Sequence, residues 1–283
     1  MTAVRTLLAV AAESLAASGI SSASVDARLL LAHAWGVNVA ELQRLQLLGR
    51  EPAAEVQVRF DALVEERMTR VPLQHLTGVA PFRGLELRVG PGVFVPRPET
   101  EMIVDAVLAE VAGTAAQVVD LCTGSGAIAL AIKQEAPAAC VAAVELDPLA
   151  HAWAVRNAEV LGLDVAIELG PAQAALPGSE GTLDVVVSNP PYIPVGMVPI
   201  DPEVRDHDPE VSLYGGSADG LRIPLEVAAR AAELLRPGGL LVMEHADSQG
   251  DSLPRALARA GWSDVADHRD LAGRPRAVTA RAD

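Results

Sequence analysis

Hydrophobic and polar positions in the first quarter of the chain alternate with a helical period. Through residues 1–75 apolar side chains recur every three or four positions, which is the spacing of one helix face. The pattern predicts about four helices, the first at residues 2–18, with Ser24 and Asn38 as N-caps and Pro52 in a first turn. We interpret these residues as a small helical bundle, in which His33 is a packed core histidine.

The texture changes at residues 76–98, where prolines and glycines separate short stretches. Leu85–Val89 alternates between apolar and charged residues, so this segment is predicted to be a linker that contains a β-hairpin. Its last part, Pro96-Arg97-Pro98-Glu99, is stiff because proline restricts the backbone on both sides of Arg97. Glu99 and Glu101 are simplest to read as favourable charges at a helix N-terminus. The alternative is a loop that projects Arg97 and the carboxylates toward a cleft.

From residue 99 onward, short apolar runs alternate with helical segments, the pattern of a doubly wound α/β domain. Strands are predicted at residues 117–121, 140–144, 165–169, 183–188, 240–245, 263–271 and 276–281. Helices are predicted at residues 102–111, 127–135, 149–161, 221–235 and 253–260. The last two strands form a closing pair, so we expect a mostly parallel sheet with an antiparallel closing strand.

Three loops fall at the carboxyl ends of predicted strands, where ligands bind in open α/β sheets. The first is Thr123-Gly124-Ser125-Gly126, whose glycines permit close approach to the backbone. It lacks the last glycine of the dinucleotide motif and the lysine of a P-loop. The second contains Glu145, about twenty residues further on, where a carboxylate can hold ribose hydroxyls. Asp147 is better explained as a helix cap.

The third loop, Ser188 to Tyr192, ends the apolar run Leu183–Val187. Because Pro190 cannot donate to a sheet, the strand must stop there. The Asn189 amide oxygen, the Pro190 carbonyl and the Tyr192 ring then face one space and suit a planar –NH2 group. A plain proline turn explains the same residues equally well when they are taken alone.

Together the three loops predict that the chain binds S-adenosylmethionine and methylates a nitrogen atom. Glu145 can hold a nucleoside, and the loops lack the residues that bind phosphate groups. An amide nitrogen is a poor nucleophile, so catalysis would consist mainly of alignment and desolvation. The three loops contain no histidine or lysine, and we therefore predict no strong general base.

The composition and charge of the chain indicate which kinds of partner it can bind. The 283 residues carry a formal charge of −15, which disfavours duplex nucleic acid because that ligand is held by lysine and arginine. We expect no signal peptide, no membrane span and no metal site. Cys122 and Cys140 adjoin apolar runs and are predicted to be buried thiols in a reducing, cytoplasmic setting.

Asn189-Pro190-Pro191-Tyr192 after a strand is the signature of amino-methyltransferases that act on adenine, cytosine or glutamine. It occurs here with Pro96 to Glu101, Leu73 to Gly78, Asp120 to Ile128 and Glu244-His245. In this combination the chain resembles the release factor glutamine methyltransferase family (PrmC/HemK), over nearly its whole length.

The resemblance implies three segments: a helical substrate-docking domain at residues 1–75, a linker at 76–98 and a Rossmann-like S-adenosylmethionine-dependent methyltransferase domain at 99–283. It implies methylation of the glutamine side-chain nitrogen in the Gly-Gly-Gln loop of peptide chain release factors, with S-adenosylhomocysteine as the other product. Asn189, Pro190 and Tyr192 would be catalytic, and these three with Pro191, Arg97 and Glu99 would bind the substrate. The implied cofactor ligands are Cys122, Thr123, Gly124, Ser125, Gly126, Glu145, Ala172 and Asn189.

The chain departs from the family pattern at two places. Cys122 stands where the family usually has glycine, and we expect a slightly altered but functional loop. Gly170-Pro171-Ala172 lacks the acidic residue usual near the adenine, so a backbone group of Ala172 is the predicted replacement.

Two further readings stay open. A nucleic-acid amino-methyltransferase acting on adenine N6 would use the same tip, but it would need a basic surface or aromatic side chains that stack on the bases. A non-catalytic factor-binding protein could keep the fold, although the intact Asn189 to Tyr192 motif argues against it. We expect a monomer that acts on protein, without direct contact to nucleic acid or membrane.

Overall fold

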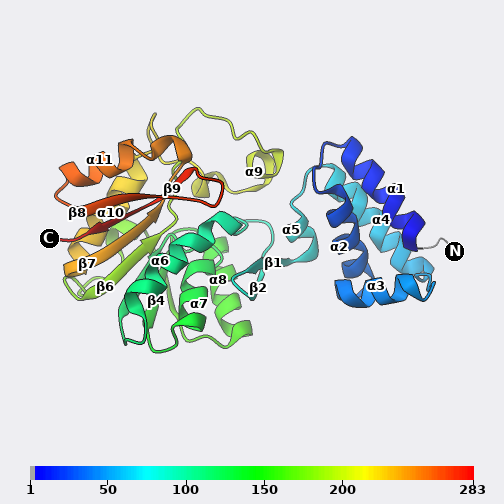
Figure 1. The fold of residues 1–283 in the computed structure, drawn as a ribbon, viewed down its shortest axis with the longest axis horizontal. Helices are drawn as coiled ribbons and strands as arrows, with labels where there is room; N and C mark the ends of the chain where they lie inside the picture. Colours follow the sequence, from blue (N-terminus) through cyan, green and yellow to red (C-terminus); the bar gives the residue numbers. More distant parts are fainter. Residues whose placement is uncertain (1–3) are drawn as a thin grey trace. The chain divides into compact units, whose positions relative to one another are not determined.

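The computed structural model describes residues 4–283, which form two compact units (Figure 1). The helical unit contains the chain up to Val79 and, in addition, Pro199–His207. The α/β unit contains Ala80–Val198 and Asp208–Asp283. The sequence pattern places residues 199–207 in the α/β domain, whereas their contacts place them in the helical unit.

The helical unit is built around one apolar core. Its largest fully buried side chains are Leu15, Leu30, Leu31, Leu42 and Phe60. The helices are α1 (Val4–Ala17), α2 (Ala23–Trp35), α3 (Val39–Leu47), α4 (Ala54–Met68), α5 (Leu73–Thr77) and α9 (Pro202–His207). Residues 2 and 3 of the first predicted helix lie outside the described residues.

The structure corrects two of the predicted helix starts, Ser24 and Pro52, and the predicted burial of His33. Asn38 does cap α3, accepting a hydrogen bond from the Glu41 N–H at 2.8 Å, but Ser24 lies inside α2, which begins at Ala23. Pro52 precedes α4 instead of lying in its first turn. His33 is exposed. It lies beside the buried stripe of α2 instead of on it, so the prediction of a core histidine is wrong.

A buried ion-pair network joins α9 to the rest of the helical unit. Arg67, on α4, contacts Asp26 at 2.8 Å and Glu203 at 2.7 Å. Arg70 donates to the Glu203 carboxylate as well. Burial by itself would raise the pKa of Glu203, but the hydrogen bonds from the two arginines oppose it, and that pKa is lowered to about 2. Glu203 is thus a charged anchor with two cationic partners.

The α/β unit has a small hairpin and a seven-stranded sheet. The hairpin consists of β1 (Val79–Phe82) and β2 (Leu85–Arg88). The sheet has the order β5-β4-β3-β6-β7-β9-β8. Its strands are β3 (Gln117–Leu121), β4 (Cys140–Glu145), β5 (Ala166–Leu169), β6 (Leu183–Ser188), β7 (Leu235–Glu244), β8 (Ser263–Arg269) and β9 (Pro275–Arg281).

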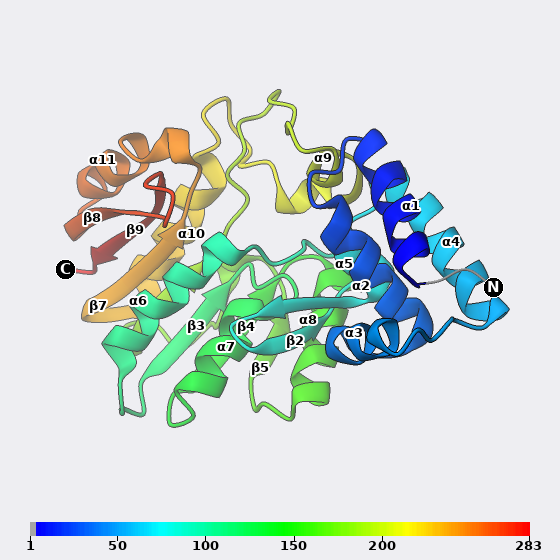
Figure 2. The ribbon, with the colours of Figure 1, turned by 45° about the vertical axis from the view of Figure 1, so that its right-hand side comes forward.

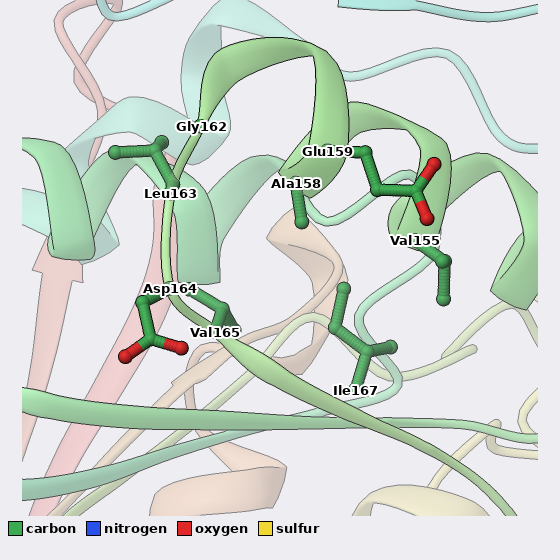
Figure 3. A pocket seen from close by; sticks show the side chains of 8 residues that line it. All are labelled: Val155, Ala158, Glu159, Gly162, Leu163, Asp164, Val165 and Ile167. Carbon is green, nitrogen blue, oxygen red and sulfur yellow. The ribbon is translucent and has the colours of Figure 1, made fainter.

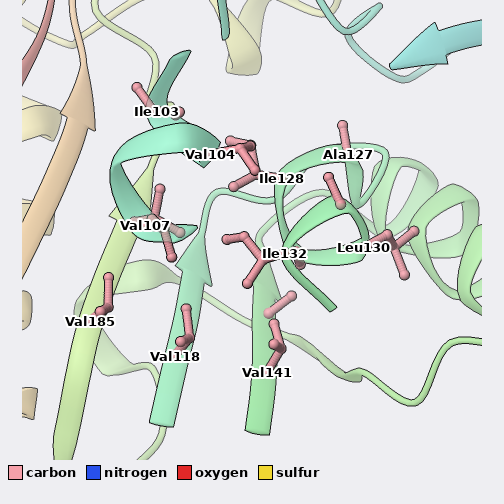
Figure 4. Packing of buried hydrophobic residues seen from close by; sticks show 14 of the residues in the cluster. Ile103, Val104, Val107, Val118, Ala127, Ile128, Leu130, Ile132, Val141 and Val185 are labelled. Carbon is pink, nitrogen blue, oxygen red and sulfur yellow. The ribbon is translucent and has the colours of Figure 1, made fainter. Parts of the chain in front are cut away.

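Helices cover both faces of this sheet (Figure 2). On one face α6 (Glu101–Val111), α7 (Ala127–Glu135) and α8 (Pro148–Leu161) pack against alternate residues of the strands. Figure 4 shows Val107 of α6 and Ile132 of α7 directed toward the strands that carry Val118 and Val141. The other face is covered by α10 (Arg222–Leu234) and α11 (Ser252–Arg259).

The strand directions locate the ligand-binding edge. β3 to β7 run parallel, and only β9 pairs antiparallel with β7 and with β8. From β3 the chain first proceeds to β4 and β5 and then returns to the other side of β3 as β6. This reversal is a topological switch point, and ligands bind there beyond the carboxyl ends of the strands. The predicted α/β sheet with an antiparallel closing pair is confirmed.

Candidate active site

The strand register places the predicted loops side by side. Leu121 pairs with both Val144 and Ser188, and Ser188 pairs with Met243. The residue that follows each of these is therefore a neighbour across the same edge of the sheet. Those residues are Cys122, Glu145, Asn189 and Glu244. The sheet thus brings together the glycine loop, the carboxylate and the proline tip.

The glycine loop alternates between ordinary and left-handed backbone. Cys122, Gly124 and Gly126 have φ values of 65°, 59° and 83°. A side chain at Gly126 would also be crowded, because a Cβ atom there would lie 3.0 Å from the Leu130 side chain. Cys122 adopts a conformation that favours glycine, which suits a position where a glycine is expected. Its thiol pKa is raised by burial and by the charges of Glu145 and Asp120, so it stays protonated. Cys140 is exposed, so its predicted burial is wrong.

Asp120 lies fully buried just before this loop. Its Oδ2 accepts the Thr123 hydroxyl at 2.5 Å and the Ala129 N–H at 3.2 Å. Among residues 4–283, no partner is recorded for the buried Oδ1. Burial raises the pKa of Asp120 to about 7, although both hydrogen bonds favour the ionised form. A carboxylate oxygen held this way is suited to a cation.

Glu145 ends β4 and binds the loops on both sides of it. Oε2 accepts the Gly124 N–H at 2.7 Å, and Oε1 accepts the Asp147 N–H at 2.8 Å. Each carboxylate oxygen can accept a further hydrogen bond. Burial raises the pKa of Glu145, opposed by the N–H groups of Asp147 and Gly124. Asp147 itself caps α8 through bonds from Leu149 and Ala150, as predicted.

The segment after β5 lies next to Glu145, since the Gly170 N–H donates to the Glu145 carbonyl at 2.8 Å. Pro171 precedes the short 3-10 helix Ala172–Ala174, and Ala172 is buried. The first N–H groups of a helix have no partner within it. Ala172 therefore offers a backbone donor, at a place where the chain has no carboxylate.

The proline tip contains two hydrogen-bond acceptors, the Asn189 amide oxygen and the Pro190 carbonyl. The Asn189 –NH2 group donates to the Thr100 hydroxyl oxygen at 3.4 Å, which leaves the amide oxygen Oδ1 for another partner. Within the described residues, no donor is recorded for Oδ1 or for the Pro190 carbonyl. The role of these two acceptors toward a substrate stays a prediction.

The base of the tip is held from three directions. The Tyr192 hydroxyl donates to Glu244 Oε1 at 3.1 Å, and the Tyr192 carbonyl accepts from Gln249 Nε2 at 3.0 Å. Ile193 N–H donates to the Leu213 carbonyl at 2.8 Å. Burial raises the pKa of the Tyr192 hydroxyl, and the negative charge of Glu244 adds to this effect. Tyr192 is therefore a neutral donor.

Arg97 and Glu99 are arranged differently from the projecting loop considered above. Arg97 contacts Asp208 at 3.0 Å, and its guanidinium lies 5.1 Å from the centre of the Phe94 ring. Glu99 is exposed, while Glu101 accepts the Arg83 N–H at 3.1 Å. Arg97 thus has internal partners, and its role toward a substrate stays a prediction, as does that of Glu99.

Sequence reasoning did not assign roles to Asp120, Thr100 and Glu244. One signal was present, because a charged residue interrupts one apolar strand run at Asp120 and ends another at Glu244. Thr100 was considered only as a helix start.

A surface hollow lies away from this site, between α8 and β5 (Figure 3). It is lined by Val155, Ala158, Glu159, Gly162, Leu163, Asp164, Val165 and Ile167. Asp164 and Val165 precede β5, so the hollow is at the amino ends of the strands, opposite the loops described above. In the described chain no helix is long and apolar enough to cross a membrane, and no cluster of metal-binding side chains occurs in residues 4–283.

Comparisons with known proteins decide the family. Residues 6–78 match the PrmC N-terminal domain, and residues 85–197 match the methyltransferase small domain. The release factor glutamine methyltransferase of Streptomyces coelicolor is 48% identical over 281 residues, covering 97% of this chain and 96% of that protein. The enzyme of the same name from Bifidobacterium longum is 44% identical, with 94% and 95% covered.

The chain belongs to the release factor glutamine methyltransferase family. It is accordingly an enzyme of the methyltransferase class, and the family predicted from the sequence is confirmed.

Solved structures agree with the fold of this family. A T. thermophilus 16S rRNA methyltransferase in complex with AdoMet and guanosine has a TM-score of 0.53 and 22% identity, covering 72% of this chain and 50% of that one. At this identity the likeness concerns the fold alone. The Rossmann-like methyltransferase fold predicted from the sequence is thereby confirmed.

Proposed function

We propose that the protein transfers a methyl group from S-adenosylmethionine to the side-chain amide nitrogen, N5, of the glutamine in the Gly-Gly-Gln motif of peptide chain release factors. Family membership supports the reaction. The observation that carries the choice of acceptor is the tip, where Asn189 Oδ1 and the Pro190 carbonyl have no donor among the described residues. Two acceptors at one place match the two hydrogens of a primary amide.

The cofactor ligands follow from unused hydrogen-bonding groups. Asp120 Oδ1 is buried without a recorded partner in residues 4–283, and it would hold the ammonium group of the methionine part. Glu145 has acceptor capacity left for the two ribose hydroxyls. The backbone of Cys122 to Gly126 would line the methionine chain, and the Ala172 N–H would face the adenine. These residues fit S-adenosylmethionine.

The chemistry needs orientation more than proton transfer. When bound, S-adenosylmethionine supplies a methyl group activated by a positively charged sulfur. Asn189 and Pro190 would hold the amide hydrogens, so that the nitrogen lone pair faces the methyl group. Tyr192 would pack on the amide and exclude water. Transfer would form the C–N bond as the S–C bond breaks, which would leave a neutral thioether, and the proton lost from the nitrogen would pass to solvent.

The finer features of the proposal concern partners and location. The release factor would dock on the helical unit and enter the site by its Gly-Gly-Gln loop. A net charge of −15 supports a protein substrate over a nucleic acid. We propose that the enzyme acts as a monomer in the cytoplasm.

Mass spectrometry of a release factor tests this function. Treatment with the wild type and S-adenosylmethionine should add one methyl group to the glutamine, and Asn189→Ala should reduce the rate by about 100-fold, as for the loss of a positioned polar group. Gln134→Ala is the matched control, because Gln134 is an exposed amide side chain near the end of α7, and it should keep full activity.

Two results would contradict the proposal. One is a release factor that stays unmodified with the wild type while added DNA or RNA is methylated. The other is equal activity of Asn189→Ala and Gln134→Ala, which would show that the tip takes no part in the reaction.

A further inference from the structure

The side-chain amide of one buried glutamine is bonded to the backbone of the proline tip. Gln249 ends the short 3-10 helix that follows β7, and it is 3% exposed. Its Nε2 donates to the Tyr192 carbonyl at 3.0 Å and to the Asp219 carbonyl at 2.8 Å. Its Oε1 accepts the Ala246 N–H at 3.0 Å. This side chain therefore joins three separate segments of the α/β unit.

The partners of Gln249 allow one orientation of its amide. A glutamine –NH2 group has two hydrogens to donate, whereas the amide oxygen only accepts. Both hydrogens are used, because two backbone carbonyls face the nitrogen and a backbone N–H faces the oxygen. Turning the amide over would place acceptor against acceptor and donor against donor, which is costly for buried groups. A glutamate at this position would likewise present an acceptor to both carbonyls.

The contact with Gln249 fixes one end of a peptide plane, since the Tyr192 carbonyl and the Ile193 N–H belong to the same planar unit. The other end is fixed by the Leu213 carbonyl, which accepts the Ile193 N–H at 2.8 Å. The Tyr192 ring is held as well, because its hydroxyl donates to Glu244 Oε1 at 3.1 Å. Tyr192 is thus held at its carbonyl, at the next N–H and at its ring.

Gly220 packs against the same carbonyl. A Cβ atom at Gly220 would lie 2.1 Å from the Tyr192 carbonyl oxygen and 2.9 Å from Gln249 Nε2. Its φ of 73° also lies in the left-handed region. Only glycine lets the backbone approach this closely in this conformation. The Tyr192 carbonyl therefore has a fixed place between the glutamine amide and the backbone of Gly220.

The fixed peptide plane lies close to an acceptor atom of the tip. Between the Tyr192 and Pro190 carbonyls, the ring of Pro191 locks one backbone rotation. The rotations left are ψ of Pro191 and both dihedral angles of Tyr192. The place of the peptide plane therefore largely decides the place of the Pro190 carbonyl.

We propose that Gln249 is a positioning residue, which sets the Tyr192–Ile193 peptide and thereby the Pro190 carbonyl and the Tyr192 ring before the substrate binds. It acts through the backbone, because all three recorded partners of its side chain are backbone atoms. A displaced acceptor would misalign the substrate nitrogen and slow the transfer. The inference rests on the proposed function for the reaction whose rate is measured.

Gln249→Glu tests the proposal, because glutamate has nearly the same shape and, when ionised, has no hydrogen to donate. We expect the rate of release factor methylation per bound S-adenosylmethionine to fall by about 10- to 100-fold. The dissociation constant of S-adenosylmethionine should not change, because the partners of Gln249 are not among the proposed cofactor ligands. Gln134→Glu makes the same change on an exposed glutamine and should leave both quantities unchanged.

A merely structural role of Gln249 predicts another result. Unfolded protein binds no cofactor, so the number of binding sites counted by titration would fall while the rate per site stayed at the wild-type value. That result would overturn the proposal. Gln249→Asn carries the same test if Gln249→Glu yields no folded protein. It keeps the amide, but it is one methylene too short to reach all three partners, so the rate per site should fall here too.

Nuclear magnetic resonance gives a readout that does not depend on the substrate. The chain has two tyrosines, and only Tyr192 is followed by isoleucine. Isotope labels on the tyrosine carbonyl carbon and the isoleucine nitrogen therefore identify the Tyr192 carbonyl signal. This signal should shift in Gln249→Glu and stay in place in Gln134→Glu.

Two outcomes would overturn the proposal: an unchanged Tyr192 carbonyl signal in Gln249→Glu, or a shifted signal with a wild-type rate per site. A release factor that the wild type leaves unmodified would refute the proposed substrate. The shifted signal would in that case still support the hold of Gln249 on the tip.

Discussion

Replacing Asp120 by asparagine should stabilise the protein in a pH-dependent way. The asparagine oxygen can take the place of Oδ2 and keep the bonds from Thr123 and Ala129. Its –NH2 group then takes the place of the unpartnered Oδ1. The substitution thus removes the charge and keeps the recorded hydrogen bonds, so its effect on the free energy of unfolding reports the charge.

The size of the expected change in stability follows from the pKa of Asp120. A value of about 7 in place of 3.8 means that ionisation is less favourable in the folded chain by about 4 kcal/mol, at about 1.4 kcal/mol for each pH unit. The folded chain keeps this proton up to about pH 7, whereas the unfolded chain loses it near pH 3.8. The wild type therefore loses stability as the pH rises between these values. Asp120→Asn avoids this loss.

Urea unfolding of both proteins without cofactor, at several pH values from 4 to 8, measures the effect. The variant should match the wild type near pH 4 and exceed it by about 2–4 kcal/mol at pH 8. Asp164→Asn is a matched control, because Asp164 is exposed, and it should show no growing difference. A difference that stays constant from pH 4 to 8 would refute the reasoning.

The affinity for S-adenosylmethionine should fall in Asp120→Asn, although the same substitution stabilises the free protein. If Asp120 pairs with the ammonium group, Asp120→Asn should bind S-adenosylmethionine at least tenfold more weakly at pH 8, by loss of a charged hydrogen bond. The same substitution would then be stabilising for the free chain and harmful to the complex. If calorimetry finds the same affinity for S-adenosylmethionine in Asp120→Asn as in the wild type, Asp120 is not a cofactor ligand.

Three further predictions concern single contacts. Cys122→Gly should be more stable than Cys122→Ala by about 1 kcal/mol in urea unfolding, because both remove the thiol but only glycine relieves the left-handed backbone; the reverse order would contradict this. Glu145→Gln should weaken S-adenosylmethionine binding at least tenfold in calorimetry, since an amide nitrogen must then face the N–H of Gly124 or Asp147; full affinity would exclude the carboxylate as a ligand. Glu203→Gln should destabilise the protein by about 3 kcal/mol, by breaking a buried charge pair. Because Glu203 has a lowered pKa, the wild type should lose this advantage as the pH falls below about 4.5, and a pH-independent difference between the two proteins would argue against the ion pair.

Much of the fold was predictable because local pattern and strand register coincide. The apolar run at Leu183–Ser188 and the helix Ala127–Glu135 were placed correctly, since each is bounded by proline or glycine. The ends of three parallel strands then placed Cys122, Glu145 and Asn189 at one edge. Local sequence was enough for these residues because parallel strands all present the same end to the ligand.

The rest depended on contacts between distant segments. Glu244 and Thr100 belong to the site because β7 and the start of α6 meet the tip, over sequence separations of 55 and 89 residues. The exposure of Cys140 and His33 depends on which side of a strand or helix the fold buries. The place of residues 199–207 depends on Glu203 finding Arg67 and Arg70, and ion pairs of this kind leave no periodic signal.

The attachment of Glu203 to the helical unit bears on whether the two units can be exchanged as modules. The chain passes between them at Val79, at Val198 and again at His207. A single cut near residue 80 would leave Arg67 and Arg70 in one fragment and their carboxylate partner in the other. Transplanting the helical unit into a relative would succeed only if residues 199–207 travelled with it. Recombination between members of this family should therefore preserve both pieces together, although 119 residues separate them.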